Sequence, residues 1–394
     1  MKNKKSTLII SVALLVGSFN QGFAQRIAAG PSHSLARCYD GTARAWGYNV
    51  SGQLGDSSTG TNRSFPVRVA TISSVTALAA GGYFSMALLT GGSVWTWGEN
   101  LSYEIGDSTT TSRFSPVQVH GNGNVGFLNG ITAIAAGKYV EHALALKSDS
   151  TVWAWGGNNY GQLGDSTNVL KKTPVQVHGS GNIGFLTGII SVACGDGYSI
   201  ALKRDSTVWA WGNGYGWNPV RINGLSAITA ISAGIGHSLA IKNDGTVWAW
   251  GLNTYGQLGD STNIDRSTPI KVKGLTGIIG IAVGGKHSLA VKNDGTVWAF
   301  GWNNYGELGD GTNVDKWAPV QVSGITGVTE VKAGLSHSLA LKNDGTVWAW
   351  GWNYFGQLGD STTIDRWAPV QVKGLCTMTY TGINETPNSL NNII

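Results

Sequence analysis

Charged side chains are scarce in this sequence: Asp, Glu, Lys and Arg together make up 12% of its 394 residues. The basic residues are scattered along the chain, and Lys171-Lys172 is the nearest approach to a cluster. Proteins that bind nucleic acid through its phosphates need a dense basic surface. We therefore expect no nucleic-acid partner.

Several signals of catalysis are also missing. The sequence has no Gly-x-Ser-x-Gly elbow, no His-Glu-x-x-His and no phosphate-binding loop, which are the short motifs of hydrolases, metalloproteases and nucleotide enzymes. No Cys/His spacing is typical of a zinc site. No long segment places apolar residues at helical spacing. We expect an all-β chain that is not an enzyme and holds no metal or cofactor.

The first residues have the order of a signal peptide. Lys2, Lys4 and Lys5 precede a short apolar run at residues 8–16, and small residues then lead to Ala24. The run is too short to span a bilayer, so no membrane span is expected. We predict a leader at residues 1–24, cleavage after Ala24 and a secreted or cell-surface protein. Loss of three lysines lowers the net charge from +5 to +2, with 24 basic and 22 acidic residues.

Glycine and tryptophan are abundant, with 58 and 17 copies, and the tryptophans reveal a repeat. Residues 343–351 read Asn-Asp-Gly-Thr-Val-Trp-Ala-Trp-Gly, and the aromatic residue before the last glycine recurs with a period of about fifty residues. Seven copies occupy this position: Trp46, Trp97, Trp155, Trp211, Trp250, Phe300 and Trp350. A period of this length indicates a propeller, a solenoid or a similar array.

One clean repeat shows the unit. Short β-type runs at residues 327–333, 338–342, 347–350 and 370–372 predict four strands, and Asp344-Gly345 predicts a type I′ hairpin turn between the second and third. Four strands per unit and seven units predict a seven-bladed β-propeller over residues 25–375. The chain starts inside a unit, so the N- and C-terminal segments are expected to close the ring.

Several spaced motifs recur together in this order. One copy runs Ala233-Gly234-x-x-His237-Ser238-Leu239-Ala240, then residues 243–251 (Asn-Asp-Gly-Thr-Val-Trp-Ala-Trp-Gly), then Asn253-x-x-Gly256-Gln257-Leu258-Gly259-Asp260. This pattern resembles the repeat of the regulator of chromosome condensation family, here in an exported bacterial member. The resemblance implies a seven-bladed propeller that binds proteins with one face. It also implies guanine-nucleotide exchange, which we do not expect because an exported chain does not meet a cytosolic GTPase.

Repeated polar residues invite a site. A ring of imidazoles could bind metal, but Phe84 and Tyr198 replace histidine in two units without other change, so we predict a structural hydrogen bond to a neighbouring loop. The acids follow the Leu-Gly step and are expected to cap turns rather than bind calcium. The histidines are His33, His142, His237, His287 and His337, and the acids are Asp56, Asp107, Asp165, Asp260, Asp310 and Asp360.

The three cysteines are Cys38, Cys194 and Cys376. Cys194 lies in an apolar strand and is predicted to be a small buried residue. Cys38 and Cys376 would be neighbours in a closed ring, and a disulfide between them is conceivable in an exported protein. We favour two unpaired thiols.

The units differ from one another at a few places, and binding is expected there. Insertions follow the fourth strand of units two and three, and unit four has lost most of its loop. Aromatic and basic residues of units six and seven form a candidate binding patch of hot-spot composition, although they could instead cover contacts between blades. The candidate residues are Trp302, Trp317, Trp352, Trp367, Lys316 and Arg366.

We therefore expect an exported, non-enzymatic and monomeric propeller that binds an unknown protein. The alternatives are a carbohydrate-binding surface protein, since aromatic platforms suit sugars, and a polysaccharide lyase or hydrolase with acids or histidines on the ring axis. Residues 376–394 are predicted to be a flexible tail. They also resemble the connector that precedes a sorting domain in some bacterial surface proteins.

Overall fold

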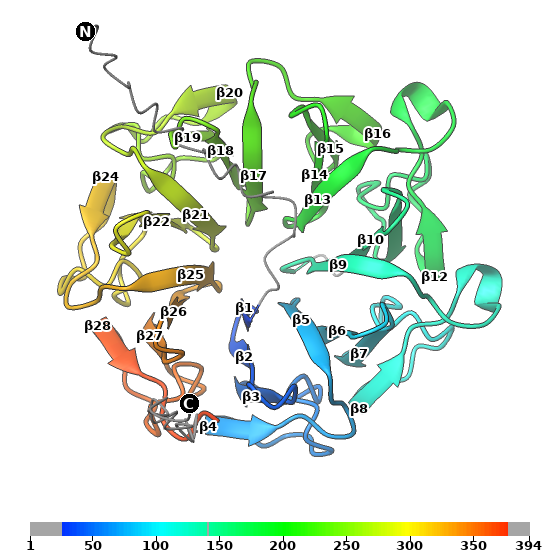
Figure 1. Cartoon of the computed structure of the whole chain (residues 1–394), viewed down its shortest axis with the longest axis horizontal. Coiled ribbons are helices and arrows are strands. Elements are labelled where there is room, and N and C mark those ends of the chain that lie inside the picture. Colours follow the sequence, from blue (N-terminus) through cyan, green and yellow to red (C-terminus); the bar gives the residue numbers. More distant parts are fainter. Residues whose placement is uncertain (1–25, 140–141, 377–394) are drawn as a thin grey trace, which may run out of the picture.

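The computed structural model describes residues 26–139 and 142–376. Its strands form seven four-stranded antiparallel sheets arranged around one axis (Figure 1). Each sheet is built from four consecutive strands, and we number these blades 1 to 7 along the chain. The predicted all-β, seven-bladed propeller is confirmed. The predicted leader and its cleavage point, and the tail beyond Cys376, lie outside the described residues.

Strands in equivalent places have nearly equal lengths. The innermost strands are β1 (Ile27–Ala29), β5 (Val75–Ala80), β9 (Ile131–Ala136), β13 (Ile189–Cys194), β17 (Ile228–Ala233), β21 (Ile278–Val283) and β25 (Val328–Ala333). The second strands are β2 (His33–Arg37), β6 (Phe84–Leu89), β10 (His142–Lys147), β14 (Tyr198–Lys203), β18 (His237–Lys242), β22 (His287–Lys292) and β26 (His337–Lys342).

The third and outer strands complete each blade. The third strands are β3 (Ala43–Gly47), β7 (Val94–Gly98), β11 (Val152–Gly156), β15 (Val208–Gly212), β19 (Val247–Gly251), β23 (Val297–Gly301) and β27 (Val347–Gly351). The outer strands are β4 (Arg63–Arg68), β8 (Arg113–Gln118), β12 (Lys171–Gln176), β16 (Gly216–Arg221), β20 (Arg266–Lys271), β24 (Lys316–Gln321) and β28 (Arg366–Gln371).

The antiparallel order decides which connections meet at each face of the ring. The turn between the first and second strands and the start of the loop after the third strand lie at the same end of a blade. A backbone hydrogen bond ties them together, as from the N–H of Trp352 to the carbonyl of Ser336 (2.8 Å). The hairpin turns after the second strands and the connections between blades lie at the other end.

The blades are held together by large side chains packed between sheets. Trp350 is fully buried against Val297 and Ala299 of blade 6, and Val347 and Ala349 on the other face of β27 pack against blade 1. Burying about 200 Å² of an indole stabilises the fold by at most about 5 kcal/mol. The tryptophan repeat is therefore the interface between blades, as the alternation along the third strand predicts.

Each buried indole also needs a hydrogen-bond acceptor. The N–H of Trp350 donates to the carbonyl of Glu307 in the preceding blade at 2.8 Å, and four other blades repeat this bond. Blade 4 has lost the loop that would supply this carbonyl. There the hydroxyl of Tyr215 accepts from Trp250 at 3.0 Å instead.

The hairpin turn after the second strand differs from the prediction. A type I′ turn needs positive φ at both central residues, but only Gly345 of the pair Asp344-Gly345 has it (83°). The Asp344 carboxylate accepts hydrogen bonds from the N–H and the hydroxyl of Thr346 at 2.9 and 2.6 Å. An Asx turn therefore takes the place of the type I′ turn.

The ring closes between blades 7 and 1. Ile27 and Trp46 pack against Leu339 and other core residues of blade 7, so the terminal segments meet as predicted. A disulfide joins Cys38, at the end of blade 1's second strand, to Cys376, with 5.7 Å between their Cα atoms. The favoured expectation of unpaired thiols is therefore wrong. Ring closure brings together two residues that are 338 apart in sequence. Cys194 is buried, as predicted.

The insertions of blades 2 and 3 contain the 3₁₀ turns η1 (Asn122–Asn124) and η2 (Ser180–Asn182). Each turn lies against the outer strand of the next blade, η1 on β12 and η2 on β16 (Figure 1). No helix in the described part of the chain has the length and hydropathy to cross a bilayer.

Candidate binding face

The repeated histidines form a belt between blades. In five blades the imidazole Nε2 lies 2.9–3.0 Å from a serine hydroxyl of the next blade. The structural role predicted for these histidines is confirmed, but the partner lies on the next blade's second strand rather than on a loop. Burial lowers the pKa of His33, His287 and His337 to about 3 and that of His237 to about 4. In the described residues no group of three or more His, Cys, Asp or Glu could hold a metal ion.

Two blades have Phe84 or Tyr198 in place of the belt histidine. Phe84 cannot form a hydrogen bond, and the residue that would face it in blade 3 is Ala143 instead of serine. Tyr198 keeps a polar group, and its hydroxyl lies 2.9 Å from that of Ser238. Each substitution of the histidine is therefore matched by the residue it faces.

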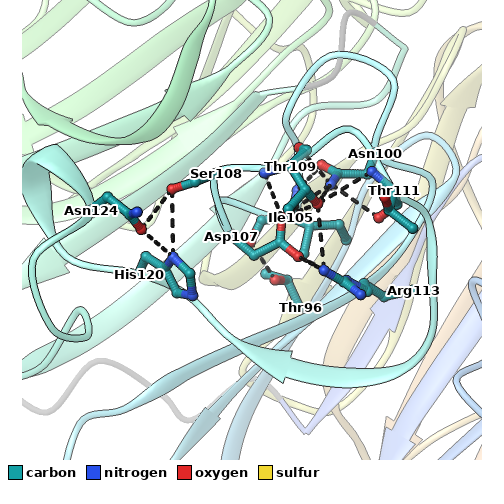
Figure 2. Close-up of polar contacts among 10 residues, drawn as sticks. All are labelled: Thr96, Asn100, Ile105, Asp107, Ser108, Thr109, Thr111, Arg113, His120 and Asn124. Atoms are coloured by element: carbon teal, nitrogen blue, oxygen red, sulfur yellow. Dashed lines mark hydrogen bonds and ion pairs between the residues drawn. The ribbon is translucent and has the colours of Figure 1, made fainter.

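The repeated aspartates cap turns, as predicted. In blade 2, Asp107 Oδ1 accepts the N–H and hydroxyl of Thr109 at 3.0 and 2.7 Å (Figure 2). Its Oδ2 pairs with Arg113 at 2.6 Å. Six blades contain this ion pair, which includes Lys316–Asp310 (3.4 Å) and Arg366–Asp360 (2.7 Å). Two of the predicted binding residues, Lys316 and Arg366, thus hold the start of an outer strand to its own loop.

A second polar cluster anchors the insertions. Figure 2 shows Ser108, His120 and Asn124 converging on one point. The amide oxygen of Asn124 lies 2.6 Å from His120 Nδ1 and 2.8 Å from Ser108 Oγ. Blade 3 repeats the cluster with Ser166, His178 and Asn182, and this recurrence indicates a structural role in holding each insertion.

Several charged residues that are not repeated between blades lie on or next to the innermost strands. Lys138 Nζ donates to the carbonyls of Ala29 and Ala333 at 2.6 and 3.1 Å. Burial lowers the pKa of Lys138 to about 8. Glu330 pairs with Lys332 at 3.4 Å and accepts the N–H of Arg26 at 3.3 Å. These groups engage one another and the backbone where blades 7 and 1 meet.

The face that carries the turn between first and second strands presents a continuous series of aromatic rings. Tyr305 contacts Trp352 (6.0 Å between centroids), Trp352 contacts Phe355 (5.3 Å), Phe355 contacts Tyr48 (4.5 Å) and Tyr48 contacts Tyr83 (6.0 Å). The series runs from blade 6 through blades 7 and 1 to blade 2. We call these five rings, together with Tyr354, the aromatic face.

Three tyrosines of the aromatic face are exposed to solvent. Tyr354 is 68% exposed and lies parallel to Trp352 with 6.3 Å between centroids. Tyr305 and Tyr83 are 40% and 37% exposed. Large, exposed and adjoining aromatic side chains are typical of protein-binding surfaces.

The four predicted tryptophans divide into two pairs. Trp352 belongs to the aromatic face. Trp302 contacts Tyr255 between blades 5 and 6, with 4.4 Å between ring centroids. Trp317 and Trp367 begin outer strands, are each 47% exposed, and pack against Gly256 and Gly306 of the preceding blade. Within the described residues no ring contact joins Trp317 or Trp367 to the other two.

Sequence reasoning missed most of the aromatic face. Tyr305 and Phe355 stand at the same place in successive loops, directly before a glycine, whereas the sequence predicts binding where the units differ from one another. Trp217 and Phe114 also share the position of Trp317 and Trp367. The signal was present as an aromatic residue before this loop glycine in three consecutive units, at Tyr255, Tyr305 and Phe355.

Comparison with known proteins agrees with this architecture. Residues 40–88, 91–146 and 149–202 match the regulator of chromosome condensation (RCC1) repeat, and residues 214–386 match the RCC1-like domain. The chain belongs to the regulator of chromosome condensation repeat family. This confirms the resemblance seen in the sequence. RCC1-like propellers are a family of protein-interaction scaffolds.

Curated relatives of this RCC1-family chain are larger proteins. It is 30% identical to human E3 ubiquitin-protein ligase HERC2 over 52% of the chain and 4% of HERC2. It is 31% identical to the mitochondrial RCC1 domain-containing protein RUG3 of Arabidopsis thaliana over 48% of the chain and 41% of RUG3. The chain thus spans less than half the length of either relative.

Solved structures share the fold. Human WBSCR16 superposes with a TM-score of 0.73 at 22% identity, covering 84% of this chain and 93% of that one. Yeast RCC1 (Prp20) bound to Kap60 gives a TM-score of 0.73 at 20% identity, covering 95% and 89%.

Proposed function

We propose that this RCC1-family propeller is an exported, non-enzymatic and monomeric scaffold that binds a partner protein with its aromatic face. The series of contacting rings across blades 6, 7, 1 and 2, with Tyr305, Tyr354 and Tyr83 exposed along it, is the observation that carries the proposal. A solved relative, yeast Prp20p, binds Gsp1p and histones. Because this solved structure of the same fold binds proteins, it supports a protein as the ligand here.

Export is supported by two independent features. The leader at residues 1–24 has the basic, apolar and small-residue order of a signal peptide. The disulfide between Cys38 and Cys376 would persist in an oxidising compartment and is rarely kept in the cytosol. Guanine-nucleotide exchange and ubiquitin ligation are not part of the proposal.

A pull-down with matched variants tests the proposal. The chain is immobilised and exposed to the exported proteins of the source cells. One variant carries Tyr83→Ser, Tyr305→Ser and Tyr354→Ser. The control carries Val125→Ser and Ile183→Ser, which are 79% and 82% exposed on the two insertions.

We expect a protein that the wild type and the insertion control capture and that the aromatic variant loses. Equal capture by the aromatic variant would overturn the proposal. A third variant, Trp317→Ala with Trp367→Ala, tests whether the outer tryptophans extend the surface. Binding to glycans on an array, lost in the aromatic variant, would instead favour the carbohydrate-binding alternative.

A further inference from the structure

Two neighbouring interfaces between blades carry the same pair of aromatic residues. Between blades 5 and 6, Tyr255 meets Trp302 with 4.4 Å between centroids. Between blades 6 and 7, Tyr305 meets Trp352 at 6.0 Å. In both, the ring planes are tilted, by 53° and 41°. Each pair forms a corner open to the same face of the propeller.

A third position differs between the two corners. The residue before the belt histidine is Lys286 in blade 6 and Ser336 in blade 7. The carbonyl of each accepts the backbone N–H of the corner tryptophan, at 2.9 and 2.8 Å respectively. The two side chains therefore start from equivalent places beside equivalent rings.

Lys286 shows what such a corner accommodates. Its ammonium lies 4.0 Å from the centroid of Trp302 and 4.7 Å from that of Tyr255. Its Nζ is also 3.5 Å from the Tyr255 hydroxyl. An ammonium at this range is attracted to the negative faces of both rings. The blade 5–6 corner thus holds an alkylammonium supplied by the chain itself.

Serine cannot supply that group in the blade 6–7 corner. Among the described residues no lysine ammonium lies over Tyr305 or Trp352. Tyr305 is 40% exposed, so the corner is open to a group from outside.

The blade 6–7 corner also contains a carboxyl group that the other lacks. Glu307, 1% exposed, accepts the N–H of Tyr305 at 2.9 Å, in the way that Gln257 accepts the N–H of Tyr255 at 2.9 Å. Asp315 adds negative charge near this carboxyl. The described residues contain no ion pair to Glu307. A buried carboxylate without a cation favours a cationic ligand.

We propose that the corner of Tyr305, Trp352 and Ser336 binds the ammonium of a lysine side chain of the partner protein, with Glu307 as the counter-charge. The proposal rests on the proposed function and names the chemistry of the partner's anchor. Tyr354, parallel to Trp352, extends the surface for the partner's neighbouring residues.

The test uses a short blocked Gly-Lys-Gly peptide as the probe and the same peptide with norleucine as its uncharged control. Binding is followed at pH 8 by the indole N–H resonance of Trp352, assigned with Trp352→Phe. We expect saturable shifts with the lysine peptide alone. Equal shifts with the norleucine peptide would overturn the proposal.

Two variants separate the parts of the corner. Ser336→Lys copies blade 6 and should abolish the shifts, because the chain's own ammonium then occupies the corner. Glu307→Gln copies Gln257 of blade 5 and should weaken binding roughly three- to thirty-fold, the range of a single charge or cation–π contact. Unchanged affinity in both variants contradicts the assignment.

Lys286→Ser provides the matched gain of function. Removing the resident ammonium should open the blade 5–6 corner, so that the Trp302 indole responds to the lysine peptide. Gln257 provides no charge there, so this new site should be weaker than the natural one.

The pull-down distinguishes this proposal from the proposed function. A partner that Ser336→Lys loses supports the lysine anchor. A partner that Ser336→Lys retains and the triple tyrosine variant loses overturns the lysine anchor and leaves the aromatic face as the binding surface. A partner that both retain overturns the proposed function itself.

Discussion

The Nε2 atom of His337 lies 3.0 Å from the hydroxyl oxygen of Ser34, and this bond joins the last blade to the first. Ser34 donates its own proton to the carbonyl of Gln357 at 2.9 Å. The imidazole must therefore be the donor, with its proton on Nε2. No described residue accepts or donates a hydrogen bond at the second, buried ring nitrogen of His337, so the structure stabilises the neutral ring.

The histidine belt predicts acid sensitivity. Burial lowers the pKa of His33, His287 and His337 from 6.5 to about 3. Below pH 6.5 these histidines bind protons in the unfolded chain but not in the folded chain. The free energy of unfolding therefore falls as the pH drops from 6.5 toward 3. Each histidine contributes up to about 1.4 kcal/mol per pH unit. Urea unfolding at pH 7.5, 6.0 and 5.0 measures this, and a stability independent of pH would contradict it.

The natural pair Phe84 and Ala143 predicts which substitutions the belt tolerates. His287→Phe alone should cost about 1–3 kcal/mol, because the hydroxyl of Ser338 loses its donor in a buried place. Adding Ser338→Ala should recover part of this loss, since the Glu307 carbonyl keeps its bond from Trp350. A double-mutant cycle by urea unfolding gives the coupling. Strictly additive losses would rule out the pairing.

The period of the sequence was enough to predict the blades. Trp350 and its six counterparts fix the number of units, and their alternation with Val347 and Ala349 predicts packing on both faces of each strand. The turn caps were predictable from an aspartate that follows the Leu-Gly step in most units. Each of these features depends on a short segment of sequence that recurs in all or nearly all of the seven units.

Contacts between distant units were harder to predict. The pairing of Cys38 with Cys376 depends on how the ring closes, which no short segment encodes. The aromatic face combines Phe355 of one loop with Tyr48 of the next blade, so neither residue signals it alone.

The disulfide predicts a loss of stability on reduction. A cross-link between residues 338 apart restricts the unfolded chain strongly, and stabilisation on the order of 2–5 kcal/mol is expected. Adding reductant should lower the midpoint of thermal unfolding. The double variant Cys38→Ser, Cys376→Ser should unfold at a lower temperature than the oxidised wild type, and reductant should not change its midpoint. Cys194→Ala is the control that keeps the response to reductant.

Tyr215 is predicted to replace the missing loop of blade 4. Its hydroxyl accepts the indole N–H of Trp250 at 3.0 Å. Tyr215→Phe leaves that buried N–H without an acceptor and should cost about 1–3 kcal/mol in urea unfolding. Tyr160→Phe removes a hydroxyl from a side chain that is 46% exposed and should cost little. Equal effects of the two substitutions would show that the bond is unimportant.

Glu307 predicts a second pH effect, opposite in sign to that of the histidines. Burial raises the pKa of this carboxyl from 4.5 to about 7. Between these values the unfolded chain has lost its proton and the folded chain keeps it, so the free energy of unfolding falls as the pH rises from 4.5 to 7 and then stays level.

Glu307→Gln removes this loss while keeping the acceptor for the N–H of Tyr305. The variant should exceed the wild type by on the order of 1–3 kcal/mol at pH 8 and match it near pH 4.5. Paired urea titrations at the two pH values isolate the effect, because the histidines titrate alike in both proteins. Gln257→Glu places a carboxyl at the equivalent buried position and should lose stability at pH 8 for the same reason. A variant no more stable than the wild type at pH 8 would mean that the carboxylate is already neutralised in the folded protein.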